Sequence, residues 1–207
     1  MTYQSTSALR KYFIMGSQNC KQNPTVVLEE AAKAGITIFQ FREKGPSSLR
    51  GGEKLWLGKQ LRAICKYYHI PFIVNDDVEL VNLLDADGIH VGQDDYSVKS
   101  LRERFPDKII GLSVSTPNEV TNSPINLVDY IGAGPIFPTT TKVDAKATVG
   151  IDWIECLRKE FPKLPIVGIG GINTTNAKLV IKSGADGVSF ISAITKAENI
   201  AEAVKAL

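Results

Sequence analysis

Short apolar segments rich in Val, Ile and Phe alternate with longer amphipathic segments along the whole chain. Short β-branched and aromatic runs predict strands, and apolar residues at helical spacing predict helices. The predicted strands are Tyr12–Met15, Thr37–Glu43, Phe72–Asn75, Gly88–Val91, Ile109–Val114, Tyr130–Gly134, Ile166–Gly170 and Gly187–Ser192. The predicted helices lie near Thr25–Ala34, Ser48–Tyr68, Val78–Leu84, Val98–Arg104, Thr116–Thr121, Ile151–Glu160, Thr175–Ser183 and Ala197–Ala206.

Each predicted strand is followed by helical sequence, with no linker and no low-complexity stretch. Eight such pairs predict the α/β class and, within it, a (β/α)8 TIM barrel formed by one domain over residues 1–207. An open doubly wound sheet is the alternative. That fold usually carries a glycine-rich turn after its first strand, whereas Met15-Gly16-Ser17-Gln18 contains no GxGxxG.

The composition excludes several kinds of partner. With 43% hydrophobic residues, 22% charged residues and a net charge of +2, the chain can bury a large core and has no basic cluster for nucleic acid or a membrane surface. No apolar run approaches the roughly 20 residues of a spanning helix, and the first residues predict no signal peptide. Cys20, Cys65 and Cys156 are far apart and odd in number, which fits a reducing cytoplasm. Small molecules are the expected partners, and a homo-oligomer stays open.

The segment Ile38–Lys44 (IFQFREK) alternates two kinds of side chain. One face would carry Gln40, Arg42 and Lys44, and the other would carry Phe39, Phe41 and Glu43. In a barrel, the two phenylalanines would pack under helices, and the polar set would face the barrel axis and its C-terminal mouth. The alternative is that Arg42 or Lys44 pairs with Glu43 or with another carboxylate at a strand end.

Acidic pairs follow the third and fourth predicted strands, namely Asp76-Asp77 and Asp94-Asp95. Carboxylates at neighbouring strand ends suit Mg²⁺, which usually takes one or two of them together with phosphate oxygens and water. The alternative is helix N-capping, by Asp76 or Asp77 in the first pair and by Asp95 in the second. His90 has no second His or Cys near it, so we expect a packed or hydrogen-bonded histidine rather than a zinc ligand.

Two further strand ends suit anions. After the sixth strand, Thr139, Thr140, Thr141 and Lys142 place hydroxyls and an ammonium on a Pro-rich turn, which would otherwise be a solvated loop. After the seventh and eighth strands, Gly171, Ile191 and Ser192 occupy the usual phosphate site of this barrel. Lys142, with Arg42, Lys44 and the aspartates, suits a diphosphate, and Gly171, Ile191 and Ser192 suit a monophosphate. Ser113 and Ser115 have no spaced His–Asp partners, so covalent catalysis is not predicted.

Seven motifs together cover nearly the whole chain: QFREK, VNDD, GIHVGQDD, GLSVST, GPIFPTTTK, IVGIGGI and ADGVSFISAI. In these motifs and in their order, the chain resembles the thiamine-phosphate synthases. These enzymes join hydroxymethylpyrimidine diphosphate to a thiazole phosphate, with or without a carboxylate, and release diphosphate. The resemblance implies a transferase of thiamine biosynthesis that uses one Mg²⁺ ion per subunit and a dissociative path without a protein nucleophile.

The resemblance also assigns roles to residues. The implied pyrimidine-diphosphate contacts are Gln40, Arg42, Lys44, Asn75, Ser113 and Lys142, of which Arg42, Lys44, Ser113 and Lys142 would be catalytic. The implied magnesium ligands are Asp76 and Asp95. The implied thiazole-phosphate contacts are Thr139, Thr141, Gly171, Ile191 and Ser192.

One position departs from the family pattern: Ser115 stands where the family commonly has His. Two alternatives remain at this level. A thiazole tautomerase of the same barrel family would use an acid–base histidine and would not need Asp76 and Asp95. A non-catalytic sensor of phosphate ligands would keep the glycine loops but would leave the metal and cation positions without a purpose.

Overall fold

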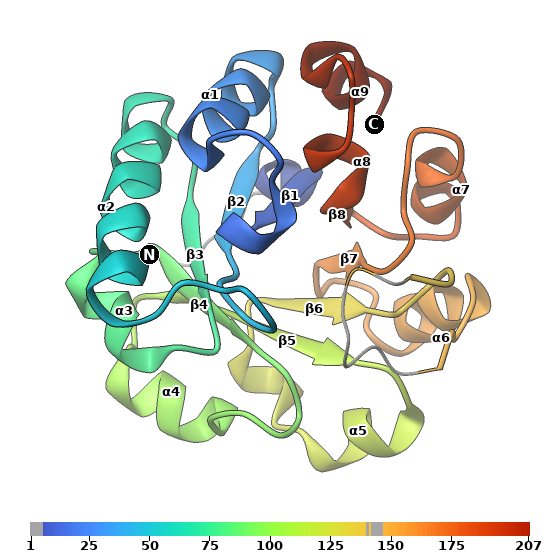
Figure 1. The fold of residues 1–207 in the computed structure, drawn as a ribbon. Coiled ribbons are helices and arrows are strands. Elements are labelled where there is room, and N and C mark those ends of the chain that lie inside the picture. The colour runs from blue at the N-terminus through green and yellow to red at the C-terminus, as the bar shows by residue number, and fades with distance from the viewer. Residues whose placement is uncertain (1–5, 140, 142–146) are drawn as a thin grey trace.

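Eight parallel strands close into a barrel in a computed structural model that describes residues 6–139, 141 and 147–207 (Figure 1). The strands, each hydrogen-bonded to the next in chain order, are β1 Lys11–Met15, β2 Ile38–Phe41, β3 Phe72–Asn75, β4 Gly88–Val91, β5 Ile109–Val114, β6 Tyr130–Ala133, β7 Ile166–Gly168 and β8 Gly187–Phe190. β1 also pairs with β8, which closes the ring. The predicted α/β class and (β/α)8 architecture are confirmed.

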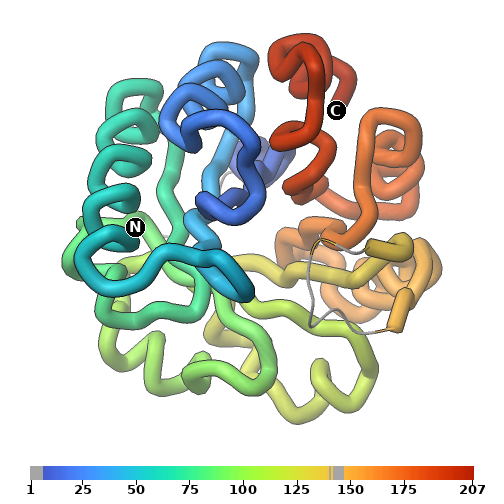
Figure 2. The backbone as a smooth tube through the Cα atoms, in the orientation of Figure 1, coloured from blue at the N-terminus to red at the C-terminus, as the bar shows by residue number. Residues whose placement is uncertain are grey.

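Helices surround the barrel. They are α1 Pro24–Ala34, α2 Gly51–Tyr67, α3 Val78–Leu83, α4 Val98–Arg104, α5 Pro117–Asn122, α6 Asp152–Glu160, α7 Ala177–Lys182, α8 Ser192–Thr195 and α9 Ile200–Ala206. The chain winds once around the ring, so that the last helix, α9, comes to lie beside the first, α1 (Figure 2). Among the described residues, no helix has both the length and the apolar character needed to cross a bilayer.

Alternate residues of each strand enter different cores. Phe13, Phe39 and Phe72 are paired across β1, β2 and β3, and their rings pack at a tilt to one another beneath the helices, with centroids 5.7 and 5.6 Å apart. Their neighbours Tyr12 and Ile38 point the other way, into a smaller core on the barrel axis. The period of two in the sequence therefore separates an outer core from an inner core.

The sequence predicts strand positions well and strand ends less well. β3, β4 and β5 have the predicted bounds, whereas the strand predicted over Thr37–Glu43 ends at Phe41 and the strand predicted over Ile166–Gly170 ends at Gly168. The residues in question leave the sheet to form loops at the mouth of the barrel. The helix predicted from Ala197 begins later, at Ile200, because Asn199 caps it by accepting a hydrogen bond from the Glu202 N–H.

Candidate active site

The carboxyl ends of the strands surround two adjoining pockets. The larger, about 220 Å³, is lined by many of the residues predicted to bind pyrimidine diphosphate and magnesium: Arg42, Lys44, Asn75, Asp76, Asp95 and Ser113. The smaller, about 40 Å³, is lined by all those predicted to bind thiazole phosphate: Thr139, Thr141, Gly171, Ile191 and Ser192. Thr139, Ile169 and Gly170 line both, so ligands in the two pockets would lie next to each other. Lys142 and Thr140 lie outside the described residues.

The alternation in β2 sends its side chains to different depths. Phe41 packs in the outer core, and Arg42, only 6% exposed, reaches the larger pocket. Gln40 lies deeper, in the barrel interior, where its Nε2 donates to the Tyr12 hydroxyl over 2.8 Å. The predicted inward face of this strand is therefore observed, with Gln40 beneath the pocket and Arg42 in its wall.

Glu43 holds two loops together. It is buried, and its carboxylate accepts hydrogen bonds from the Ser17 N–H (2.8 Å), the Ser17 hydroxyl and the Leu49 N–H (2.7 Å). Ser17 belongs to the loop after β1, and Leu49 belongs to the loop after β2, which carries Lys44. In the same region, Gln18 Nε2 donates to the Arg42 carbonyl over 2.9 Å. The loop after β1 thus holds the backbone around Arg42 and Lys44 in place.

Lys44 sits between two carboxylates. Its Nζ lies 2.6 Å from Asp76 Oδ2 and 3.8 Å from Asp95 Oδ1, so the alternative in which Lys44 pairs with a neighbouring strand-end carboxylate is observed. Burial raises the pKa of Asp76, and Asp95 adds to this effect while Lys44 opposes it. Burial also acts to raise the pKa of Asp95, but the hydrogen bond from the Gly92 N–H, together with Asp76 and Lys44, lowers it below the ordinary value.

The two residues of the first acidic pair have separate tasks. Asp77 caps α3 by accepting from the Leu80 N–H, and it forms an ion pair of 2.8 Å with Lys54. Asp76 has a φ of 60°, a left-handed conformation that Asp tolerates better than most residues, and its carboxylate lines the larger pocket. Capping by Asp77 therefore leaves the Asp76 carboxylate to line the pocket.

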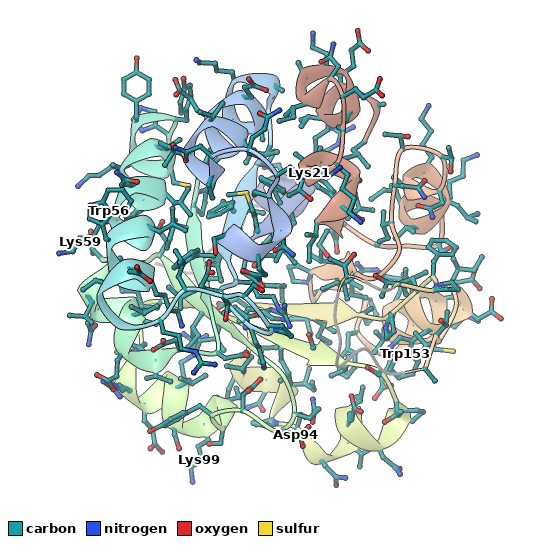
Figure 3. The ribbon with its side chains drawn as sticks, viewed as in Figure 1. Lys21, Trp56, Lys59, Asp94, Lys99 and Trp153 are labelled. Carbon is teal, nitrogen blue, oxygen red and sulfur yellow. The ribbon has the colours of Figure 1, made fainter. Side chains whose placement is uncertain are left out.

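In the second acidic pair, the N-cap interpretation of Asp95 is wrong. Ser97 caps α4 by accepting from the Ser100 N–H, whereas Asp95 accepts from the Gly92 N–H within its own loop, over 2.8 Å. Asp94 is exposed (Figure 3) and also contributes to the lining of the larger pocket. Asp95 is therefore free of a helix-capping role and faces Asp76 and Lys44.

The donor set agrees with a cation that is held jointly with a phosphate ligand. The described residues contain no group of three or more His, Cys, Asp or Glu side chains that could hold a metal by themselves. The larger pocket instead brings together the carboxylates of Asp76 and Asp95, both in contact with one lysine. Two carboxylates completed by substrate phosphates and water are a usual arrangement for Mg²⁺.

Sequence reasoning missed the partner of Ser113. His90 Nε2 lies 2.8 Å from Ser113 Oγ, a contact that the spacing of residues in the sequence did not indicate. The other ring nitrogen of His90 lies 2.9 Å from the Tyr130 hydroxyl rather than from a carboxylate, so a Ser–His–Asp triad is still not formed. The expectation that His90 is hydrogen-bonded is confirmed. The pairing of His90 with Gly111 across β4 and β5 brings Ser113 within reach, and only the strand register reveals it.

Ser115 ties two strand ends together. It is buried, its hydroxyl donates to the Gly134 carbonyl over 2.6 Å, and its N–H donates to Glu119 over 2.7 Å. The side chain therefore has a structural partner at the end of β6 as well as a place in the wall of the larger pocket.

Glycines shape the smaller pocket. Gly170 and Gly171 have φ values of 94° and 65°, which favour glycine, and a Cβ on Gly171 would lie 2.5 Å from the Pro138 carbonyl oxygen. The loop after β7 can therefore lie directly against the loop after β6. Ser192, at the start of α8, provides a hydroxyl on the opposite wall.

Comparison with known proteins gives a consistent family. Residues 11–194 match the family model described as thiamine monophosphate synthase. A thiamine-phosphate synthase of Oceanobacillus iheyensis is 63% identical over 96% of this chain and 97% of its own length, and one of Bacillus thuringiensis subsp. konkukian is 54% identical over 99% and 93%. The solved thiamine phosphate pyrophosphorylase of Pyrococcus furiosus superposes with a TM-score of 0.87 at 33% identity, covering 98% of this chain and 95% of that one.

Proposed function

The chain belongs to the thiamine monophosphate synthase family, and on that premise we propose how its residues carry out the condensation of a pyrimidine and a thiazole moiety in thiamine biosynthesis. The larger pocket binds the pyrimidine diphosphate, and the smaller pocket binds the thiazole phosphate. The single observation that carries this assignment is the joining of a cation- and carboxylate-lined pocket to a glycine-walled one.

In the larger pocket, Arg42 and Lys44 neutralise the diphosphate, and the resemblance to the family assigns the same role to Lys142, which follows β6 in the sequence. Asn75 and Ser113 orient the rest of the pyrimidine substrate. Asp76 and Asp95 hold Mg²⁺, which when bound would supply positive charge against the phosphate oxygens. Lys44 contacts both carboxylates, so its ammonium would lie beside a phosphate ligand bound at this site.

The reaction needs charge stabilisation and positioning more than a protein nucleophile. As the bond from the pyrimidine methylene carbon to the diphosphate breaks, negative charge grows on the leaving oxygens, where Arg42 and Lys44 stabilise it. The electron-rich aminopyrimidine carries the resulting positive charge. The thiazole nitrogen, held in the adjoining pocket by the phosphate contacts of Gly171 and Ser192, then donates its electron pair to that carbon.

The direct test supplies purified protein with hydroxymethylpyrimidine diphosphate, thiazole phosphate and Mg²⁺ and measures diphosphate release. We expect release only when both substrates are present, and its loss on chelation with EDTA. Turnover of a thiazole substrate alone would instead indicate a tautomerase. Binding of both ligands without release would indicate a sensor.

The two pockets can be tested separately with Ser192→Ala. The charge of the thiazole phosphate does not change during the reaction, so loss of this contact should raise the KM for thiazole phosphate and leave kcat nearly unchanged. An equal effect of Ser192→Ala on the KM for the pyrimidine substrate would contradict the assignment of the pockets.

A further inference from the structure

Five side chains form a continuous chain of hydrogen bonds across the barrel interior. Gln40 Nε2 lies 2.8 Å from the Tyr12 hydroxyl, which lies 2.7 Å from the Tyr130 hydroxyl. The Tyr130 hydroxyl lies 2.9 Å from His90 Nδ1, and His90 Nε2 lies 2.8 Å from Ser113 Oγ in the wall of the larger pocket. This series of hydrogen bonds takes one residue from each of β2, β1, β6, β4 and β5. It leads from the barrel interior to the larger pocket, where the substrate would bind.

Two glycines make room for this chain. A Cβ on Gly111 would lie 2.1 Å from Tyr130 Cζ and 2.5 Å from His90 Nδ1, and a Cβ on Gly132 would lie 3.1 Å from His90 Cε1. Glycine inside a strand weakens it and commonly marks a close approach of another group. The rings of His90 and Tyr130 lie over this space with centroids 5.5 Å apart.

Each bond in the chain has a preferred direction. The Gln40 amide nitrogen only donates, so the Tyr12 oxygen accepts from it. If Tyr12 then donates to Tyr130, Tyr130 donates to His90 Nδ1, and the His90 Nε2–H donates to Ser113, each of the three groups between Gln40 and Ser113 accepts one bond of the series and donates the next. In the reverse direction, the Tyr12 oxygen would accept from both Gln40 and Tyr130. An imidazole nitrogen is also a better acceptor than a phenol oxygen, whose lone pair is shared with its ring.

The surroundings of Tyr130 favour the same direction. Burial raises the pKa of Tyr130 well above its ordinary value, and the nearby Tyr12 hydroxyl adds to the shift. The phenol therefore keeps its proton at any pH at which the protein would be assayed and remains available as a donor to His90.

We propose that Tyr12 and Tyr130 are positioning residues that hold His90 as the Nε2–H tautomer and thereby turn the Ser113 hydroxyl into a hydrogen-bond donor toward the larger pocket. The ligand atom that meets Ser113 is then an acceptor, a phosphate oxygen or a ring nitrogen of the pyrimidine diphosphate. This step rests on the proposed function for the identity of the ligand. The His90 tautomer and the direction of donation along the hydrogen bonds do not depend on the identity of the ligand.

The tautomer can be read without substrate. The chain has two histidines, and the other, His69, is exposed, so ¹⁵N-histidine labelling gives two sets of ring signals that His69→Gln assigns. At a pH of about 8.5, where an ordinary imidazole is neutral, His90 should give the Nε2–H pattern. Tyr130→Phe should shift it toward a mixture of tautomers. An Nδ1–H pattern in the unaltered protein, or an unchanged pattern in Tyr130→Phe, would overturn the proposal.

A kinetic cycle tests the connection to the substrate. A net hydrogen bond between neutral groups contributes roughly 0.5–1.5 kcal/mol, so Tyr130→Phe should lower kcat/KM for the pyrimidine diphosphate by about two- to tenfold. It should leave the KM for thiazole phosphate within about twofold. Because Tyr130 acts through Ser113, adding Tyr130→Phe to Ser113→Ala should cause no further loss. Independent losses from the two changes would mean that Tyr130 only supports the fold.

Two further variants keep the test decisive. Tyr12→Phe removes the hydroxyl that is hydrogen-bonded to Tyr130 and should cause a smaller shift toward the mixture of tautomers. This variant replaces Tyr130→Phe in the test if Tyr130→Phe folds poorly. Tyr67→Phe is the matched control, since Tyr67 is 75% exposed on α2 and should change neither signal nor rate. Absence of diphosphate release by the unaltered protein would count against the proposed function and leave the tautomer result standing.

Discussion

The loop after β2 supplies two cationic side chains to the wall of the larger pocket, where we propose that diphosphate binds. Arg42 is almost completely buried there, in a wall that also carries Lys44. A planar guanidinium can make two parallel hydrogen bonds to phosphate oxygens, whereas an ammonium acts as a point charge. The charge at position 42 is therefore only part of its contribution.

For that reason Arg42→Lys should lose diphosphate affinity although the charge is kept. A hydrogen bond to a charged group is worth roughly 1.5–3 kcal/mol, which corresponds to a loss on the order of tenfold to a hundredfold. Calorimetric titration with diphosphate and Mg²⁺ would measure it. The control is Lys59→Arg on the outer surface of α2 (Figure 3), which should bind as the unaltered protein does. Equal affinity for Arg42→Lys would remove Arg42 from the diphosphate site.

Glu43→Gln is the second change at this scale. From the sequence, Glu43 belongs to the outer face of the strand, so its replacement should leave diphosphate binding nearly unchanged. The structure shows that its carboxylate is buried and accepts three hydrogen bonds, whereas a glutamine amide has one acceptor oxygen. We expect a loss of unfolding free energy of about 1.5–3 kcal/mol, measured by urea denaturation. An unchanged midpoint would show that the loops after β1 and β2 do not depend on this carboxylate.

The alternation of side chains in β2 could be predicted because a strand has a period of two. The partners of Glu43 and His90 could not, because they come from strands or loops that are distant in sequence and meet only when the barrel closes. Ser17 and Glu43 are 26 residues apart, and His90 and Ser113 are 23 apart. Local pattern carries no information about such pairs.

At the scale of elements, the helix caps likewise divide into one that the local sequence predicts correctly and one that depends on tertiary structure. The sequence predicts an N-cap for α3 at Asp76 or Asp77, and Asp77 supplies it. It predicts Asp95 for α4, but Ser97 supplies that cap because the loop after β4 turns Asp95 back toward Gly92. When several capping residues stand close together, the tertiary path of the loop selects among them.

Asp77→Ala should therefore lower the free energy of unfolding by about 0.5–2 kcal/mol through loss of the α3 cap. Catalysis should be affected far less, since Asp77 pairs with Lys54 and the pocket is lined by Asp76 instead. Urea denaturation and a diphosphate-release assay on the same preparation would separate the two effects. A large loss of kcat with unchanged stability would mean that Asp77, rather than Asp76, faces the substrate.

At the scale of the whole molecule, the barrel could be predicted almost completely, since eight repeats of strand and helix leave few topologies. The loops at the mouth of the barrel were harder to predict, because they follow irregular paths determined by contacts between neighbouring loops. The described residues nevertheless bring together, in two pockets, nearly all of the implied contacts except Gln40, which lies beneath them.

The reactivity of the three cysteines toward a thiol reagent would measure how tightly the barrel is packed. Cys65 is fully buried, and burial raises the pKa of its thiol; burial and the nearby Glu43 raise the pKa of the half-buried Cys20 to about 11. Cys156 is exposed on α6. Because the thiolate is the reactive form, iodoacetamide at a pH of about 8 should label Cys156 first and leave the other two largely unreacted. Mass spectrometry with and without urea would check this order, and rapid labelling of Cys65 in native protein would show that the barrel opens.

The space above Gly111 has a consequence for the history of the sequence. A methyl group there would collide with the rings of both Tyr130 and His90, so residue 111 can enlarge only when both rings are lost or displaced. The three positions are expected to evolve together. Relatives that keep either ring should keep glycine at 111, and a wider choice of residue there is expected only where both rings are lost.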